Sequence, residues 1–177
     1  MKKIEPRIGI FRGTFDPVHI GHIAFALAAK HAANLDKVYF LPEQNPLQKT
    51  IVTDYKTRIK LLSDALKKYD ELDVIELENF QGSIKLVIPR LREIFKDSKL
   101  VFLMGSDVAI TVPGWPDLGS LTQDNELVIG LRNKDQKTTL DEILLALTPK
   151  PDALKIIEAP YPDVSSTLIH NNRNQKK

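Results

Sequence analysis

Two histidines beside a glycine-containing turn, within residues 8–22 (IGIFRGTFDPVHIGH), are the residues of this chain best suited to chemistry. His19 and His22 stand three residues apart, a spacing that places both on the same side of a helix. A helix N-terminus offers free backbone N–H groups to an anion. Gly13 permits a tight turn and Gly21 leaves room for a phosphate. The pattern predicts a phosphate site in which imidazoles stabilise a transferring phosphoryl group.

The spacing of the histidine pair by itself also fits two other interpretations. Histidines three apart on a helix are often ordinary surface or packed residues. Zinc is a further option, but no nearby cysteine or spare histidine completes a ligand set, and His31 lies more than a turn away. We therefore expect no metal ion bound by a dedicated set of protein ligands.

Composition indicates one ordinary globular domain spanning residues 1–177. Hydrophobic residues make up 42% and charged residues 27% of the chain, and the formal charge of +2 gives no global attraction to nucleic acids or acidic membranes. There is no cysteine, which excludes disulfides and cysteine catalysis. No apolar run approaches the roughly 18 residues of a spanning helix. We expect a cytoplasmic protein with neither a nucleic-acid nor a membrane partner.

The apolar pattern predicts an α/β fold. Continuous apolar runs, typical of buried strands, alternate with stretches of helical periodicity. The expected strands are residues 7–11, 37–41, 72–77, 99–105, 126–131 and 153–159. The expected helices are residues 18–33, a segment carrying Ile59, Leu62, Leu66 and Tyr69 on one face, and residues 83–96 and 139–147. This alternation implies a Rossmann-like parallel sheet with helices on both faces, which binds ligands beyond the carboxyl ends of its strands.

Two places are expected to depart from this regular pattern. Pro89 lies inside the helix expected at residues 83–96 and should kink it or delay its start. A last helical turn should begin near Ser165 or Ser166, and the polar tail 171–177 is expected to fray.

The whole string GTFDPVHIGH is more specific than its histidines. It resembles the signature of the HxGH nucleotidyltransferase superfamily, in which a Rossmann-like domain transfers a nucleotidyl group from a nucleoside triphosphate. The resemblance implies that the backbone of Gly13, Thr14 and Phe15 lines the nucleotide site. It also implies that His19 and His22 contact the phosphates of ATP, and that His22 stabilises the transition state most directly.

A second stretch, FLMGSDVAITVPGWPDL, is similar to the strand end and loop of bacterial nicotinate-nucleotide adenylyltransferases. Gly105 and Asp107 match the Gly-Ala-Asp of that branch, and Trp115 its tryptophan. An aspartate after a strand can accept hydrogen bonds from ribose hydroxyls, and an indole can face a pyridine ring. A helix N-cap aspartate and a core tryptophan are the plainer alternatives.

A third stretch, VSSTLIH, resembles the superfamily's Ile-Ser-Ser-Thr-x-Ile-Arg motif near the C-terminus. Ser165, Ser166 and Thr167 would then open a helix that holds the triphosphate. His170 replaces the final arginine, so we expect Arg173, one turn further on, to reach the phosphates instead. A protonated His170 and a tail that touches nothing are the alternatives.

The chain also departs from the family pattern on the acceptor side. The usual Pro-Pro-His-Lys loop keeps Lys49 but has Gln48 for its histidine, and Ser-Tyr-Thr is reduced to Gly82, Ser83 and Ile84. Relatives commonly run on for another element after the position of the last residue here. Arg132 follows a strand where relatives often carry an arginine, although a solvated loop charge fits equally well.

Together the resemblances predict an enzyme that transfers AMP from ATP to a pyridine mononucleotide, with nicotinate mononucleotide as the expected acceptor, in NAD biosynthesis. The acceptor's 5′-phosphate attacks the α-phosphorus in line and pyrophosphate leaves, so positioning and charge stabilisation supply the catalysis. His19, His22 and Lys49 are the expected catalytic residues, and Ser83 and Trp115 the expected acceptor contacts. Mg²⁺ accompanies ATP, bound mainly by its phosphates.

Two alternatives to this function stay open. One is another adenylyltransferase of the superfamily, such as phosphopantetheine adenylyltransferase, although that branch usually has threonine where His19 stands. The other is a nucleotide-binding protein without turnover, suggested by Gln48, Ile84 and His170. The oligomeric state is not determined by the sequence, and a homo-oligomer is one option.

Overall fold

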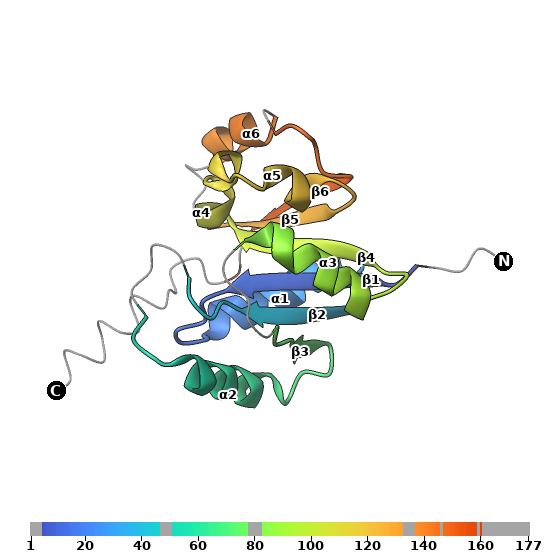
Figure 1. The fold of residues 1–177 in the computed structure, drawn as a ribbon. Coiled ribbons are helices and arrows are strands. Elements are labelled where there is room, and N and C mark those ends of the chain that lie inside the picture. Colours follow the sequence, from blue (N-terminus) through green and yellow to red (C-terminus); the bar gives the residue numbers. More distant parts are fainter. Residues whose placement is uncertain are drawn as a thin grey trace.

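A six-stranded, wholly parallel sheet forms the centre of the protein in the computed structural model, which describes residues 5–46, 51–77, 83–132, 137–145, 147–158 and 160. The order of the strands is β3-β2-β1-β4-β5-β6 (Figure 1). Their bounds are β1 Arg7–Gly13, β2 Lys37–Pro42, β3 Leu72–Val74, β4 Lys99–Gly105, β5 Glu126–Leu131 and β6 Ala153–Glu158.

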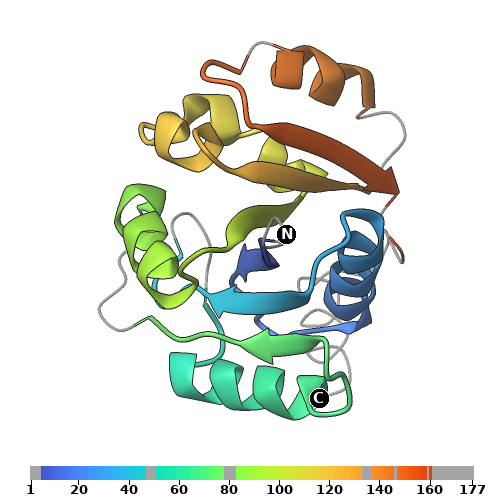
Figure 2. The same ribbon diagram turned by 90° about the vertical axis from the view of Figure 1, so that its right-hand side faces the viewer.

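Helices cover both faces of this sheet. Their bounds are α1 Ile20–Ala32, α2 Tyr55–Leu66, α3 Ile84–Ile94, α4 Ser106–Ala109, α5 Leu118–Thr122 and α6 Lys137–Leu145, with a 3₁₀ turn, η1, at Val112–Gly114. Figure 2 shows α1 and α3 on opposite sides of the strands. Within the described ranges, no helix combines the length and the apolar character that a membrane span requires.

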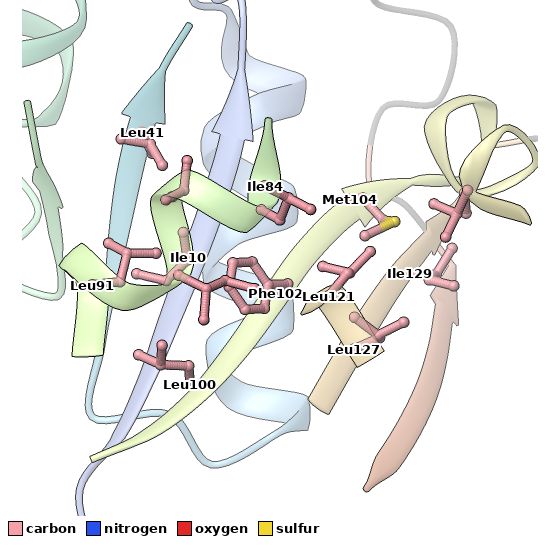
Figure 3. Close-up of a cluster of buried hydrophobic side chains, with 14 of the residues drawn as sticks. Ile10, Leu41, Ile84, Leu91, Leu100, Phe102, Met104, Leu121, Leu127 and Ile129 are labelled. Carbon is pink, nitrogen blue, oxygen red and sulfur yellow. The ribbon is translucent and has the colours of Figure 1, made fainter. Parts of the chain in front are cut away.

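The two faces of the sheet carry separate hydrophobic clusters because successive strand residues point to opposite sides. On β1, Ile8 and Ile10 join residues of α3, α5 and α6 in one cluster, part of which is drawn in Figure 3. Phe11 joins residues of α1 and α2 in the other cluster. We call these sides the α3 face and the α1 face. Even-numbered and odd-numbered residues of β1 therefore lie on different faces of the sheet. The face on which a side chain lies decides which side of a site at the strand ends it can reach.

The predicted α/β class and its parallel, doubly covered sheet are confirmed, and β4 and β5 have the predicted bounds. The predicted third strand is too long, because β3 ends at Val74 and Leu77 instead packs in the α3-face cluster. Tyr69 lies beyond the end of α2 rather than on it, although it still packs against the α1-face cluster. In both places the residue lies outside the regular element, but its side chain still packs in or against a core cluster.

Two further local predictions need correction. The start of α3 is not delayed by Pro89, because the helix begins at Ile84 and continues past the exposed proline. The short elements α4, η1 and α5 were not predicted, since four, three and five residues are too few for a periodic pattern. The turn expected near Ser165 and the tail 171–177 lie outside the described residues.

A close approach of α1 to β5 gives a test of this packing. A Cβ at Gly130 would lie 2.7–3.1 Å from three atoms of the Phe25 ring. We expect Gly130→Ala to lower the free energy of unfolding by about 1–3 kcal/mol, the usual cost of overpacking, in urea denaturation. Gly114→Ala is the matched control, because nothing lies within 4 Å of its added Cβ. Equal destabilisation by the two variants would contradict the packing.

Candidate active site

The site lies at the carboxyl ends of β1, β4 and β5, where the strand order reverses. β1 and β4 are neighbours in the sheet, but β1 is followed in sequence by β2 on one side and β4 by β5 on the other. Connections that leave such neighbours in opposite directions open a crevice between them, which is the usual ligand position in this type of sheet. The segments that leave β1 and β4 contain most of the residues that the sequence singled out.

The histidine pair begins α1, directly beyond β1. His19 is the N-cap residue, with extended backbone, and His22 occupies the third helical position. The two rings stack with their centroids 3.6 Å apart and an angle of 28° between their planes. His22 Nδ1 accepts a hydrogen bond from the His19 backbone N–H at 3.2 Å. Because that nitrogen acts as an acceptor, the neutral His22 ring carries its proton on Nε2, as a donor.

Burial controls the charge of His19. The residue is 8% exposed, and its Nδ1 is buried without a hydrogen-bond partner among the residues that the structure describes. Burial, with a smaller contribution from the positive charge of Arg132, lowers the His19 pKa to about 4. At neutral pH the ring is therefore uncharged, which allows the close stack with His22. A buried nitrogen without a partner is also what a site built for a ligand would contain.

Gly105 ends β4, the neighbour of β1 in the sheet, and Asp107 follows it in α4. A Cβ on Gly105 would collide with Asp107 Oδ1 and lie 3.6 Å from Arg132 Nε, so the missing side chain leaves room for both charged groups. Asp107 is exposed and lies in the first turn of α4. The N-cap of α4 is Gly105, so the alternative of Asp107 as an N-cap is wrong. Arg132 is fixed at the end of β5 by its backbone N–H, which donates to Ser106 Oγ at 3.2 Å.

A fully buried arginine holds the turn that precedes the histidines. Arg58, 1% exposed, comes from α2. Its Nη1 donates to the backbone carbonyls of Thr14 at 2.5 Å and Glu43 at 2.9 Å. Its Nη2 donates to the carbonyl of Gln44 at 3.1 Å and its Nε to that of Thr53 at 3.1 Å. One guanidinium thus joins the turn after β1, the segment after β2 and the start of α2.

The same turn has a strained backbone. Phe15 has φ 49°, a left-handed value that is uncommon for a residue with a side chain. In a trans peptide, the N–H points away from the carbonyl of the preceding residue. With the Thr14 carbonyl directed at Arg58, the Phe15 N–H is directed to the opposite side. Asp16 adds a second attachment, because its Oδ2 accepts the backbone N–H of Val52 at 2.7 Å.

The two residues expected to contact the acceptor lie on the α3 face. The Ser83 hydroxyl, at the N-cap of α3, donates to the Asp117 carboxylate, two residues from Trp115. The Trp115 ring packs against the α3-face cluster and its N–H donates to Thr111 Oγ1 at 3.1 Å. The ring is partly buried against the core and is not one of the buried core residues. An acceptor role for its partly exposed ring stays a prediction.

The structure thus places the stacked pair His19 and His22 beyond β1, and Gly105, Asp107 and Arg132 together at the ends of β4 and β5, with the charge of Arg132 acting on His19. Arg58 is not among the residues predicted from the sequence, although a signal was present. Arg58, Leu62 and Leu66 are four residues apart, which places the arginine on the buried stripe of α2. Seven other residues considered from the sequence lie outside the described residues: Gln48, Lys49, Gly82, Ser165, Ser166, Thr167 and His170. Arg173 lies outside them as well.

The chain resembles known proteins along most of its length. Residues 10–172 match the cytidylyltransferase-like family. A probable nicotinate-nucleotide adenylyltransferase of Clostridium novyi is 30% identical over 92% of this chain and 84% of its own length. A protein of the same name from Moorella thermoacetica is 32% identical over 92% of this chain and 78% of its own.

Solved structures resemble the fold. The nicotinic acid mononucleotide adenylyltransferase of Plasmodium falciparum, solved in complex with NaAD, superposes with a TM-score of 0.72 at 15% identity, over 94% of this chain and 83% of that one. A putative nicotinate-nucleotide adenylyltransferase of Vibrio parahaemolyticus gives 0.61 at 22% identity, over 79% of this chain and 92% of that one. These TM-scores support a shared architecture.

The lowered pKa of His19 predicts a pH-dependent stability. Between about pH 6.5 and pH 4 the unfolded chain protonates this imidazole while the native state keeps it neutral. The unfolded state then binds more protons, so the free energy of unfolding falls as pH falls through this window. The slope attributable to one such group is at most about 1.4 kcal/mol per pH unit.

Urea denaturation of the wild type and His19→Gln at several pH values between 7 and 4.5 measures this contribution. We expect the variant to lose less stability than the wild type as the pH is lowered. Parallel curves for the two proteins would show that His19 is not held neutral by the fold.

Proposed function

Because the chain belongs to the cytidylyltransferase-like family, we propose that it is a nicotinate-nucleotide adenylyltransferase. It transfers AMP from ATP to nicotinate mononucleotide and releases pyrophosphate, a step of NAD biosynthesis. The observation that carries this assignment is the stacked pair His19 and His22 at the start of α1, with Asp107 and Arg132 beside it at the strand-order reversal. This arrangement supplies donors for phosphates and an acceptor for ribose on adjacent strand ends.

The reaction needs no covalent enzyme intermediate. The acceptor's 5′-phosphate oxygen attacks the α-phosphorus of ATP in line, a new P–O–P bond forms, and pyrophosphate leaves with the electron pair of the broken bond. We assign to the Nε2–H of His22 the role of stabilising the negative charge that develops on the phosphoryl oxygens. The start of α1 and the N–H of Phe15, which points away from Arg58, would add backbone donors. Asp107 would accept the ribose hydroxyls of ATP, and Arg132 would face its phosphates.

Mg²⁺ is proposed to enter with ATP. The described residues contain no group of three or more histidine, aspartate and glutamate side chains arranged to hold a metal ion. Mg²⁺ at nucleotide sites usually keeps several waters and is bound largely by substrate phosphates, so Asp107 could contribute at most one ligand. The roles of Lys49, Ser83 and Trp115, of the Ser165–Thr167 turn and of Arg173, and the cytoplasmic location, stay predictions.

Steady-state assays of pyrophosphate release test the proposed function. With ATP and Mg²⁺, we expect turnover with nicotinate mononucleotide, formation of a dinucleotide, and loss of activity when the metal is chelated. Nicotinamide mononucleotide and phosphopantetheine are the comparison acceptors. Faster turnover with phosphopantetheine would overturn the acceptor, and ATP binding without turnover for any of the three would overturn the reaction.

Replacement of His22 separates its chemical role from its structural one. We expect His22→Ala to lower kcat by roughly 10²–10³, the usual loss for one transition-state donor, while the thermal unfolding midpoint changes little. His31→Ala is the matched control, because His31 is an exposed histidine in the last turn of the same helix. An unchanged kcat in folded His22→Ala would show that this ring does not act on the phosphates.

A further inference from the structure

The peptide plane between Thr14 and Phe15 is held in an uncommon orientation, in the turn that leads from β1 to the histidine pair. Phe15 has φ 49°, a left-handed value that residues with a side chain rarely adopt. A rotation of this one peptide plane by half a turn would bring φ to a negative value in the ordinary extended region. The Phe15 N–H would then point to the side on which the Thr14 carbonyl now lies. The turn therefore has a relaxed alternative that the folded protein must prevent.

Arg58 is the group that opposes this rotation. Its Nη1 donates to the Thr14 carbonyl at 2.5 Å, and a rotated peptide would turn the Phe15 N–H toward that same donor. Two N–H groups that face each other repel, and a buried donor that loses its acceptor costs free energy. The Arg58 side chain is buried, so water does not readily replace the carbonyl. The cation thus favours the orientation in which the Phe15 N–H points away from it.

The Arg58 guanidinium is itself fixed by contacts on its other sides. Its Nη1 also donates to the Glu43 carbonyl at 2.9 Å, and its Nη2 donates to the Gln44 carbonyl at 3.1 Å. Its Nε donates to the Thr53 carbonyl at 3.1 Å. The ring centroid of Tyr55 lies 5.4 Å from its central carbon, Cζ. Because these contacts come from other segments, the guanidinium cannot follow the carbonyl of the turn if the peptide rotates.

Glu43 attaches these contacts to β1. The Glu43 N–H donates to the carbonyl of Gly13 at 2.9 Å, and Glu43 Oε1 lies 2.9 Å from Arg12 Nε. Both partners are residues of β1 directly before the turn. The guanidinium of Arg58 and the start of the turn are therefore placed relative to each other by the same backbone. The contact between Arg58 and the turn then decides how the peptide plane is oriented.

A buried carboxylate accompanies the buried cation. Asp16 is 5% exposed, and its Oδ2 accepts the backbone N–H groups of Val52 at 2.7 Å and Thr53 at 3.2 Å. Burial lowers the Arg58 pKa, the negative charge of Asp16 opposes that change, and an arginine side chain stays protonated in proteins. A positive charge is therefore needed at this position, and lysine is the substitution that keeps it while removing the planar fork of donors.

We propose that Arg58 is a positioning residue of the transfer reaction, because it holds the Thr14–Phe15 peptide so that the Phe15 N–H serves as a phosphate donor. The proposal rests on the proposed function and deepens it, since Arg58 acts through the peptide and not on a substrate. Donors that are already oriented stabilise a transition state because nothing has to reorganise when charge develops. A rotated peptide would remove one such donor and turn it toward the carbonyls that Arg58 now binds.

Arg58→Lys tests the positioning role, because one ammonium group cannot bind the carbonyls of three segments in the geometry of the fork. We expect kcat with ATP and nicotinate mononucleotide to fall by about 10–10², as for a lost or misaligned donor. The assay is run at a temperature at which circular dichroism shows the variant to be folded. A change of stability by itself would leave kcat of the folded enzyme near the wild-type value.

Arg7→Lys is the matched control for loss of a guanidinium fork. Arg7 lies at the opposite end of β1, where its Nε donates to the Ala33 carbonyl at 3.1 Å. Its Nη1 and Nη2 donate to the Glu126 carboxylate at 3.0 and 2.7 Å. We expect Arg7→Lys to lower the thermal unfolding midpoint and to leave kcat unchanged.

Isotope labelling observes the peptide itself. Thr14–Phe15 is the only Thr-Phe pair in the sequence, so ¹³C-carbonyl threonine combined with ¹⁵N-phenylalanine gives one signal in a carbonyl-selected amide NMR spectrum. In the wild type we expect MgATP to shift the Phe15 N–H proton downfield, as a phosphate contact does. In Arg58→Lys we expect the Thr14 carbonyl signal to change without ligand and the Phe15 amide to lose most of its response to MgATP. Arg7→Lys should give the wild-type spectra.

The outcomes separate this proposal from the proposed function. Unchanged kcat in folded Arg58→Lys overturns the positioning role alone, and so does a lower kcat with an unchanged Thr14–Phe15 signal. A wild-type Phe15 amide that does not respond while other signals saturate with MgATP also overturns it. A wild type that converts no nicotinate mononucleotide overturns the proposed function, and the positioning role with it.

The wild type decides if Arg58→Lys does not fold. With ¹⁵N in the arginine guanidinium groups as well, a coupling across the hydrogen bond from Arg58 Nη1 to the Thr14 carbonyl is measured with and without MgATP. We expect the coupling in both states together with the response of the Phe15 amide. Absence of either one overturns the proposal.

Discussion

The Arg58 guanidinium contributes a positive charge to the interior and is satisfied there by backbone carbonyls of three separate segments. Burying a charge is costly unless its donors are hydrogen-bonded, and here four carbonyl contacts meet that requirement. The acceptors belong to the turn after β1, the segment after β2 and the residue before α2. None of these segments could move without leaving part of a buried cation unsatisfied. The position of the turn that we propose to bind phosphate therefore depends on Arg58, a side chain buried beneath it.

That constraint also explains how an uncommon backbone conformation persists. A left-handed residue such as Phe15 costs free energy unless its surroundings determine it. The Thr14 carbonyl is held by Arg58 on one side of Phe15, and the Asp16 carboxylate binds the backbone before α2 on the other. The Phe15 ring packs against Phe11, Phe40 and His22. Three independent attachments thus fix the turn from which α1 and its histidine pair begin.

Strand alternation and burial then distribute charge across the crevice. Phe11 and Arg12 are consecutive, so one enters the α1-face cluster and the other faces the opposite side, next to Glu43. His19 is kept neutral by burial and by Arg132, which permits two imidazoles to stack at 3.6 Å without like-charge repulsion. The neutral His19 thus adds no positive charge beside Arg132.

The sequence by itself determined what local periodicity and contiguous motifs can encode. Apolar runs predicted the alternation of strands and helices and the bounds of β4 and β5, and the ten residues GTFDPVHIGH predicted a histidine pair at a helix start after a strand. Only the tertiary structure decided the neutral state of His19, the pairing of Arg12 with Glu43 and the attachment of Arg58 to Thr14. Arg12 is separated from Glu43 by 31 residues and Thr14 from Arg58 by 44. Hydropathy along the chain indicates which face of an element is buried. Whether a charged side chain can be buried depends on the partners that the folded chain brings to it from other elements.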